Sequence, residues 1–299
     1  MNFRVLLRLG RVSNLPTVVS NTLAGALLGT NGLALGDSAI PLIEASLCAS
    51  ALYVGGMFLN DAFDAEWDAR HRPERPIAMG EISRTLVFVL SALLLIAGAG
   101  YASLVAWRRH SPGGAIAALV TSIAIIAYNR WHKGFGFAPV IMGLCRAGAI
   151  GMGALLLTPE PQTIVWVAAA CVWAHTVGLT HVASFEAGTG ARDGALLERG
   201  IAALVFVPAA GLLAVLVMTR PAVVAALLLV VQLAWQIYLL RLVTRRVPRG
   251  IPRAVGGLIA GMALLDAGFV ALDGPLLAVA ICFSCWPLTL LAQRRIAGT

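Results

Sequence analysis

The residues whose types and spacing could do chemistry lie in one short stretch, 60–75, which reads NDAFDAEWDARHRPER. On a helix that advances about 100° per residue, Asn60, Asp64 and Asp68 lie above one another, and Asp61 falls at the edge of the same face. Carboxylates this close repel one another unless a cation lies between them. Oxygen ligands of this kind suit a hard divalent ion. We call these four residues the acidic face, and they predict a metal site.

The loop expected after the acidic face supplies positive charge. Pro73 and Pro76 end the helix, and the residues before them favour extended geometry. The loop then presents Arg72 and Arg75 beside the carboxylates, whereas Glu66 points roughly away from them. Salt bridges between arginines and carboxylates account for this pattern. The same arrangement also suits a diphosphate, with Mg2+ bridging carboxylate and phosphate while the guanidiniums bind the remaining oxygens.

Composition indicates what must position these residues. The chain of 299 residues is 59% hydrophobic and only 12% charged, whereas soluble proteins carry about 25% charged residues. Its charges occur in short bursts between apolar runs of spanning length. The sequence therefore predicts a single all-α integral membrane domain over 1–299, a bundle of nine or ten transmembrane helices. The expected spans are 15–35, 40–59, 86–106, 115–128, 138–157, 164–182, 201–218, 222–240, 255–272 and 275–291.

The basic residues predict an orientation. If the N-terminus is cytoplasmic and all ten runs cross, 18 of the 22 Lys and Arg residues lie inside and three outside, which follows the positive-inside rule. The acidic face is then cytoplasmic, and we expect a bacterial inner membrane. The net charge of +8 is explained by topology, so no nucleic-acid partner is expected. The last two runs also allow one span plus a re-entrant or surface segment.

Polar residues near the predicted spans extend the candidate site. Tyr128, Arg130 and Lys133 follow the fourth run and suit either an interfacial anchor or substrate binding. Arg146 lies about eight residues into an apolar run, where charges usually mark an interior polar site. Asn14, near the start of the first span, fits a helix–helix hydrogen bond or a ligand contact. Asp266 suits an interhelical hydrogen bond better than catalysis.

These residues together resemble the UbiA superfamily of intramembrane prenyltransferases along nearly the whole chain. The acidic face is similar to the first aspartate-rich motif of that family, and the run from Arg72 to Gly80 is similar to the segment that follows it. The resemblance implies a helical bundle with a cavity opening to lipid and a magnesium–diphosphate site at its cytoplasmic end. The second aspartate-rich motif is reduced here, because only Glu186 remains of its acids. The implied metal ligands are Asn60, Asp61, Asp64, Asp68 and Glu186.

The resemblance implies Mg2+-dependent transfer of an isoprenoid from a prenyl diphosphate to a small-molecule acceptor, which we expect to be aromatic, within the lipid membrane. Two alternatives stay open, a membrane terpene cyclase and a non-catalytic protein that binds or transports prenyl lipids. The expected catalytic residues are Asp64, Asp68 and Lys133. The expected substrate-binding residues are Asn14, Arg72, Arg75, Tyr128, Arg130 and Arg146.

Overall fold

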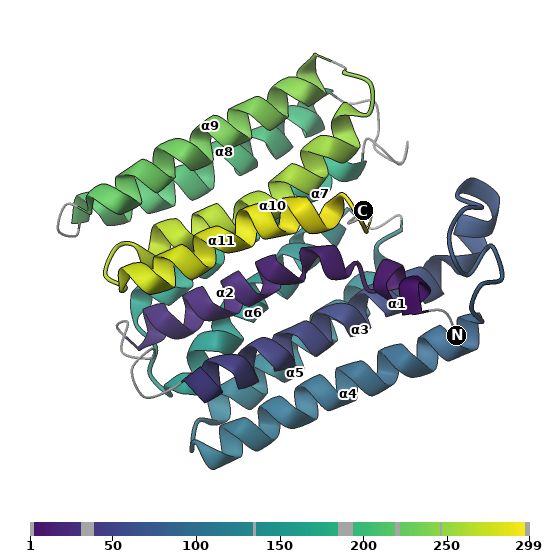
Figure 1. The fold of residues 1–299 in the computed structure, drawn as a ribbon, viewed down its shortest axis with the longest axis horizontal. Coiled ribbons are helices and arrows are strands. Elements are labelled where there is room, and N and C mark those ends of the chain that lie inside the picture. The colour runs from purple at the N-terminus through teal and green to yellow at the C-terminus, as the bar shows by residue number, and fades with distance from the viewer. Residues whose placement is uncertain are drawn as a thin grey trace.

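The computed structural model describes residues 3–30, 39–133, 136–184, 194–218, 222–245 and 247–296, and these residues form helices joined by turns, as predicted (Figure 1). The elements are α1 Phe3–Leu9, the short 3₁₀ helix η1 Val12–Asn14, α2 Leu15–Gly29, α3 Ala39–His71, α4 Arg84–Arg108, α5 Pro112–Trp131, α6 Ala138–Leu157, α7 Thr163–Ser184, α8 Gly194–Met218, α9 Val223–Thr244, α10 Gly250–Val270 and α11 Leu276–Gln293.

Eight of the described helices are long and apolar enough to cross a bilayer, so the chain is an integral membrane protein. They include α10 and α11, which are the last two predicted runs. Helix α2 has 15 described residues, a length of about 22 Å against a hydrocarbon core of about 30 Å. The predicted number of nine or ten spans therefore stays a prediction.

The two largest apolar clusters of the bundle share α2 and α6. One joins α2, α3, α4, α5 and α6, and the other joins α2 and α6 with α7, α8, α9 and α10. The α2–α6 contact is close because a β-carbon at Gly25 would collide with the carbonyl of Ile150, and one at Gly153 would collide with the carbonyl of Thr22. Small residues allow such backbone approaches between membrane helices. Glycine contacts therefore bring together α2 and α6, the helices that both clusters share.

Helix α10 lies at the centre of the bundle and is almost wholly buried. Its one acidic residue, Asp266, accepts a hydrogen bond of 2.5 Å from Ser20 Oγ and bonds of 2.8 and 3.0 Å from Asn21 Nδ2. Both donors belong to α2. The predicted interhelical role of Asp266 is confirmed.

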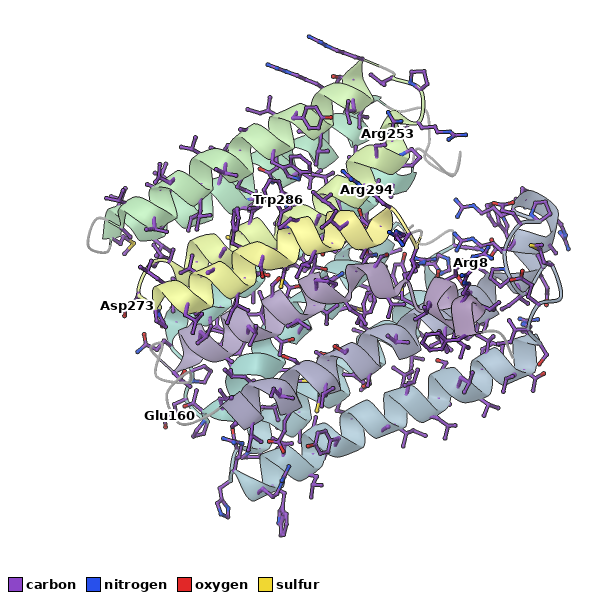
Figure 2. The ribbon with its side chains drawn as sticks, viewed as in Figure 1. Arg8, Glu160, Arg253, Asp273, Trp286 and Arg294 are labelled. Atoms are coloured by element: carbon purple, nitrogen blue, oxygen red, sulfur yellow. The ribbon has the colours of Figure 1, made fainter. Side chains whose placement is uncertain are left out.

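The acidic face and many basic side chains lie at the same end of the bundle. Arg8, Arg253 and Arg294 are at one end, and Glu160 and Asp273 are at the other (Figure 2). Helix α1 packs against the C-terminal part of α3 at the basic end (Figure 1). This distribution follows from the charge pattern of the sequence. The side of the membrane on which this end lies stays a prediction.

Candidate functional site

The site is built at the C-terminal end of α3, which runs without a break through the acidic face to His71. Asp61 and Asp68 are buried and Asp64 is partly buried. Glu66, on the opposite side of the helix, is exposed and pairs with Arg84, with Oε1 and Nη1 separated by 2.7 Å. The predicted direction of the acidic face is therefore confirmed.

Arg11, to which the sequence analysis assigned no role in the site, joins it from the turn between α1 and η1. Its Nη2 donates to Asn60 Oδ1 at 3.2 Å and to Asp61 Oδ1 at 3.3 Å. Its backbone has a φ of 42°, a left-handed conformation that is uncommon outside glycine and clusters at functional sites. Arg75 Nη1 lies 3.7 Å from the same Asp61 oxygen. Asp61 is thus held between two guanidiniums.

This environment shifts the pKa values of Arg11 and Arg75 in opposite directions. Burial acts to lower the pKa of Arg11, but Asp61 together with Tyr53, Tyr128 and Asp64 outweighs it, and the pKa is raised. Burial, followed by repulsion from Arg11, lowers the pKa of Arg75 despite the nearby carboxylates. Arginine keeps its charge in proteins, so both residues contribute positive charge to this corner.

Asp64 faces the end of α5. Lys133 Nζ lies 2.6 Å from Asp64 Oδ1, and His132 Nε2 lies 3.3 Å from it. Lys133 also lies 4.7 Å from the centre of the Trp67 ring, and the Arg72 guanidinium lies 5.6 Å from that ring. Such cation–π contacts hold positive charge over an aromatic face. The structure therefore places Lys133 and Arg72 beside the acidic face.

Two other predicted site residues are placed differently. Arg130 is exposed on the outward side of α5. Asn14 is buried between helices, where its Nδ2 donates to the Tyr53 hydroxyl at 3.3 Å and its Oδ1 accepts from Gln293 at 2.9 Å. Of the two roles left open for Asn14, the structure supports the interhelical hydrogen bond. Glu186 lies outside the described residues.

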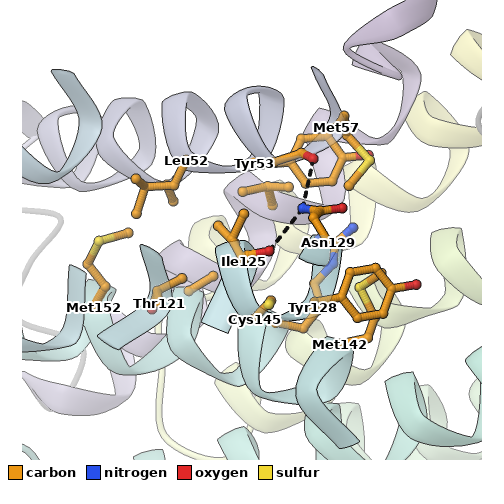
Figure 3. A pocket seen from close by; sticks show the side chains of 15 residues that line it. Leu52, Tyr53, Met57, Thr121, Ile125, Tyr128, Asn129, Met142, Cys145 and Met152 are labelled. Atoms are coloured by element: carbon orange, nitrogen blue, oxygen red, sulfur yellow. Dashed lines mark hydrogen bonds between the residues drawn. The ribbon is translucent and has the colours of Figure 1, made fainter. Parts of the chain in front are cut away.

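A mostly apolar cavity lies among α2, α3, α5 and α6 (Figure 3). Tyr53, Met57, Tyr128 and Asn129 lie towards one end of it, and Met152 lies at the other. Fifteen residues from α2, α3, α5 and α6 line it, namely Val18, Ala49, Leu52, Tyr53, Gly56, Met57, Thr121, Ile125, Tyr128, Asn129, Met142, Cys145, Arg146, Ala149 and Met152. Tyr128 and Arg146, both predicted, therefore lie on the wall of one cavity.

Asn129 is a cavity residue to which the sequence analysis assigned no role. Its Nδ2 donates to the carbonyls of Ile125 at 2.9 Å and Gly56 at 3.2 Å. Its Oδ1 is buried and has no hydrogen-bond partner among the described residues. The available signal was its position four residues before Lys133, in the last turn of α5.

The acidic face fits a metal through its donor chemistry. Among the described residues, no three His, Cys, Asp or Glu side chains come together as a ligand set. Mg2+ is typically held by one or two carboxylates together with substrate phosphates, so it does not need three. Asp64 and Asp68, one turn apart, supply two carboxylates. Asp61 is paired with the guanidiniums of Arg11 and Arg75, and Asp64 is paired with Lys133 and His132.

Replacement of Arg11 tests this arrangement. Arg11→Gln is expected to lower the free energy of unfolding by about 3 kcal/mol, because a mostly buried carboxylate loses one of its partners. The measurement is thermal unfolding of the detergent-solubilised protein. Arg8→Gln is the matched control, since Arg8 forms an exposed pair with Glu81 at 3.5 Å and should cost less than about 1 kcal/mol. An equal loss of unfolding free energy in the two variants would contradict the importance of the Arg11–Asp61 pair for stability.

Comparison with known proteins identifies related sequences. A model of the UbiA prenyltransferase family matches residues 18–250. The digeranylgeranylglyceryl phosphate synthase of Methanopyrus kandleri is 29% identical over 164 residues, which are 55% of this chain and 57% of that protein. The synthase of the same name from Methanosarcina mazei is 32% identical over 140 residues, 44% of this chain and 47% of that protein. The matched segments thus span about half the length of these curated relatives.

A solved structure shares the fold. The UbiA homolog from Archaeoglobus fulgidus bound to GPP and Mg2+ is 15% identical, superposes with a TM-score of 0.64, and is matched over 95% of this chain and 99% of its own. The family match covers the acidic face, the loop after it and the cavity helices α3, α5 and α6. On this match, the chain belongs to the UbiA prenyltransferase family.

Proposed function

We propose that the protein transfers an isoprenoid chain from a prenyl diphosphate to an acceptor inside the membrane. The observation that carries the proposal is the junction of two surfaces. Carboxylates and cations at the ends of α3 and α5 form a charged rim, and the apolar cavity is lined by Met57 and Asn129, which precede Asn60 and Lys133 by about one helical turn. A diphosphate attached to a hydrocarbon tail has the same division between charge and apolar surface.

Asp64 and Asp68 are the proposed ligands of Mg2+, with Asn60 as a further oxygen donor and Glu186 as a candidate from the second half of the chain. Mg2+, when bound, would neutralise the diphosphate and make it a better leaving group. Lys133 lies within 2.6 Å of Asp64, so its ammonium is within reach of an anion bound there. Asp61 serves in this proposal as the counter-ion of Arg11.

Positive side chains at the rim are proposed to stabilise the charge of the departing diphosphate. Arg72, Arg75 and Lys133 are the principal candidates, and Arg130 has a more peripheral position. The bond between C1 of the isoprenoid and the bridging oxygen breaks, and both electrons leave with the diphosphate. A nucleophilic atom of the acceptor gives an electron pair to C1, and its proton is released to water. The apolar cavity wall keeps other water from the allylic cation.

The acceptor and the membrane are also proposals. An aromatic acceptor is the expectation from the sequence, whereas the relatives are named for a product that carries a glyceryl phosphate. The assay therefore tests both aromatic acceptors and glyceryl phosphate acceptors. The proposed membrane is the bacterial inner membrane with the acidic face towards the cytoplasm, supported by the basic residues at that end. The named relatives are archaeal, so they do not support the bacterial assignment.

The proposal is tested with purified protein, geranyl or geranylgeranyl diphosphate and Mg2+. Diphosphate release should depend on the acceptor and should stop when EDTA removes the metal, then return with added Mg2+. Mass spectrometry of the lipid product identifies the new bond. A cyclic hydrocarbon formed without acceptor would instead assign a terpene cyclase. Binding of the prenyl diphosphate without turnover would assign a carrier protein.

A further inference from the structure

A groove on the outside of the bundle takes no part in the proposed transfer. It lies between α9 and α11 and is lined by Val231, Ala234, Trp235, Tyr238 and Trp286. None of these residues lines the cavity among α2, α3, α5 and α6. The groove holds about 410 Å³, which is within the range of about 300 to 1,000 Å³ that is typical of ligand sites. It therefore has room for a ligand of its own.

Aromatic rings form the wall of this groove. Helices α9 and α11 both pack against α10 (Figure 1), and the rings of Trp235 and Trp286 meet between them with centroids 5.1 Å apart. Trp235 is fixed from behind, because its Nε1 donates to the carbonyl of Gly257 on α10 at 2.9 Å. The Tyr238 ring lies 5.6 Å from the Trp235 ring. This ordered aromatic wall offers a hydrocarbon chain a large apolar surface.

The depth of the groove places it in one leaflet of the bilayer. Its lining residues on α9 run from Val231 to Tyr238, and Arg241 follows Tyr238 by three residues. With a rise of 1.5 Å per residue, the groove extends from about 5 to about 15 Å below Arg241. Half of a hydrocarbon core of about 30 Å is also about 15 Å. The groove therefore spans the leaflet at the basic end of the bundle.

Unpaired positive charge gathers at that end of the groove. Arg245 follows Tyr238 by seven residues, two helical turns, so it lies on the same side of α9 as the groove. Six exposed arginines belong to the ends of α9, α10 and α11, and none of them forms an ion pair with another described residue. We call these six residues the basic patch: Arg241, Arg245, Arg249, Arg253, Arg294 and Arg295.

Helix α10 brings the members of the basic patch together. Its first residue, Gly250, lies against the carbonyl of Leu242 on α9. One and a half turns later, the carbonyl of Gly256 accepts a hydrogen bond of 3.1 Å from Gln293 of α11. Arg253 and Arg294 accordingly lie at the same end of the bundle (Figure 2). The sequence runs 241–253 and 294–299 contain no acidic residue, so this surface is uniformly positive.

Membrane topology explains the sign of this charge, and the groove adds a second requirement. The positive-inside rule is satisfied by arginines anywhere at this end, whereas these arginines adjoin an apolar groove of one-leaflet depth. A phospholipid with an anionic headgroup has the same division, because guanidiniums bind its phosphate and apolar surface binds its tail. A second copy of the chain fits poorly, since in the same orientation it brings its own basic patch to this end.

We propose that the groove and the basic patch together bind an anionic phospholipid from the leaflet at the basic end. One acyl chain lies on the aromatic wall, and the phosphate meets the arginines. The lipid also offsets the repulsion among the six guanidiniums, which holds the ends of α9, α10 and α11 together. This site is separate from the acidic face, and its occupation does not depend on prenyl transfer.

The experiment compares phosphatidylglycerol with phosphatidylcholine of the same acyl chains. Native mass spectrometry of the full-length, detergent-solubilised protein resolves each bound lipid as added mass and gives the association constant of the first one. Wild-type protein should bind phosphatidylglycerol at least about fivefold more tightly, the ratio expected when one arginine meets an anionic headgroup. Equal affinity for the two lipids would overturn the proposal.

A pair of double variants tests the basic patch. Arg241→Gln with Arg245→Gln should bring the affinity for phosphatidylglycerol down to that for phosphatidylcholine. Arg70→Gln with Arg130→Gln is the matched control, because it removes the same net charge from exposed positions on α3 and α5, at the same end but across the bundle (Figure 1). The control should keep the wild-type preference, since distant surface charges are screened. An equal loss in the two double variants would reduce the effect to diffuse attraction and reject the site.

A third variant tests the groove without changing any charge. Ala234→Phe fills the groove, and it should also abolish the tighter binding of phosphatidylglycerol. Ala226→Phe is its control, because Ala226 is exposed on the opposite side of α9, and it should bind lipid as wild type does. Thermal unfolding checks that all variants are folded, which is expected because every substituted residue is exposed.

Three further results would overturn the proposal. A preference for phosphatidylglycerol that survives in Ala234→Phe would show headgroup attraction without the groove. A dimer mass that Ala234→Phe removes would assign the groove to a second copy of the chain. Displacement of phosphatidylglycerol by an equimolar amount of geranylgeranyl diphosphate would assign it to an isoprenoid. None of these measurements uses turnover, so their outcome is independent of the proposed function.

Discussion

Replacement of Asp64 by asparagine is expected to lower kcat/KM for prenyl diphosphate consumption by at least about 100-fold, the size of effect seen when one preorganised charge-stabilising group is removed from an active site. The substitution keeps the size of the side chain and removes its charge. Asp64 contacts Lys133 at 2.6 Å and His132 at 3.3 Å, so it is both the proposed metal ligand and the group that orders the end of α5. Asp68→Asn should act in the same direction. Initial rates with saturating Mg2+ measure both effects.

Glu66→Gln is the matched control for Asp64→Asn. Glu66 belongs to the same helix, two residues further along, but it points away from the acidic face and pairs with Arg84 on the surface. Its loss should change kcat/KM by less than about twofold, because exposed ion pairs contribute little. Full activity in Asp64→Asn, or an equal loss in Glu66→Gln, would reject the acidic face as the diphosphate site.

The second large effect is expected at the contact between α2 and α6. Gly25→Ala places a methyl group against the Ile150 carbonyl, and backbone atoms cannot rotate away as a side chain can. The helices must separate, and we expect a loss of about 3 kcal/mol in the free energy of unfolding, at the upper end for overpacked sites. A lower midpoint of thermal unfolding in detergent measures this loss.

Gly100→Ala provides the control for Gly25→Ala. Gly100 lies on an exposed side of α4, and a β-carbon there meets nothing within 4 Å. Alanine in the interior of an exposed helix should be neutral or stabilise by up to about 1 kcal/mol. If Gly25→Ala also proves neutral, the two halves of the bundle do not depend on the glycine contact.

The sequence by itself determined the fold class and the direction of the acidic face. Apolar runs of spanning length admit few structures other than membrane helices, because backbone groups in lipid must be hydrogen-bonded within the segment. The helical period then requires Asp64 and Asp68 to share a face and turns Glu66 away from it. Proline at positions 73 and 76 ends α3 where the rim begins. These are local properties of the chain, so no tertiary contact was needed to predict them.

Only the tertiary structure decided how those residues are partnered. Arg11 and Asp61 are 50 residues apart, and nothing in their local sequence indicates that they meet. Asn14 and Arg146 looked alike in the sequence, as polar groups inside apolar runs. In the fold, the amide of Asn14 forms hydrogen bonds with Tyr53 and Gln293, whereas Arg146 lines the cavity. The physical reason is that helical period fixes direction within one helix, while the rotation of each helix against its neighbours depends on packing across the whole bundle.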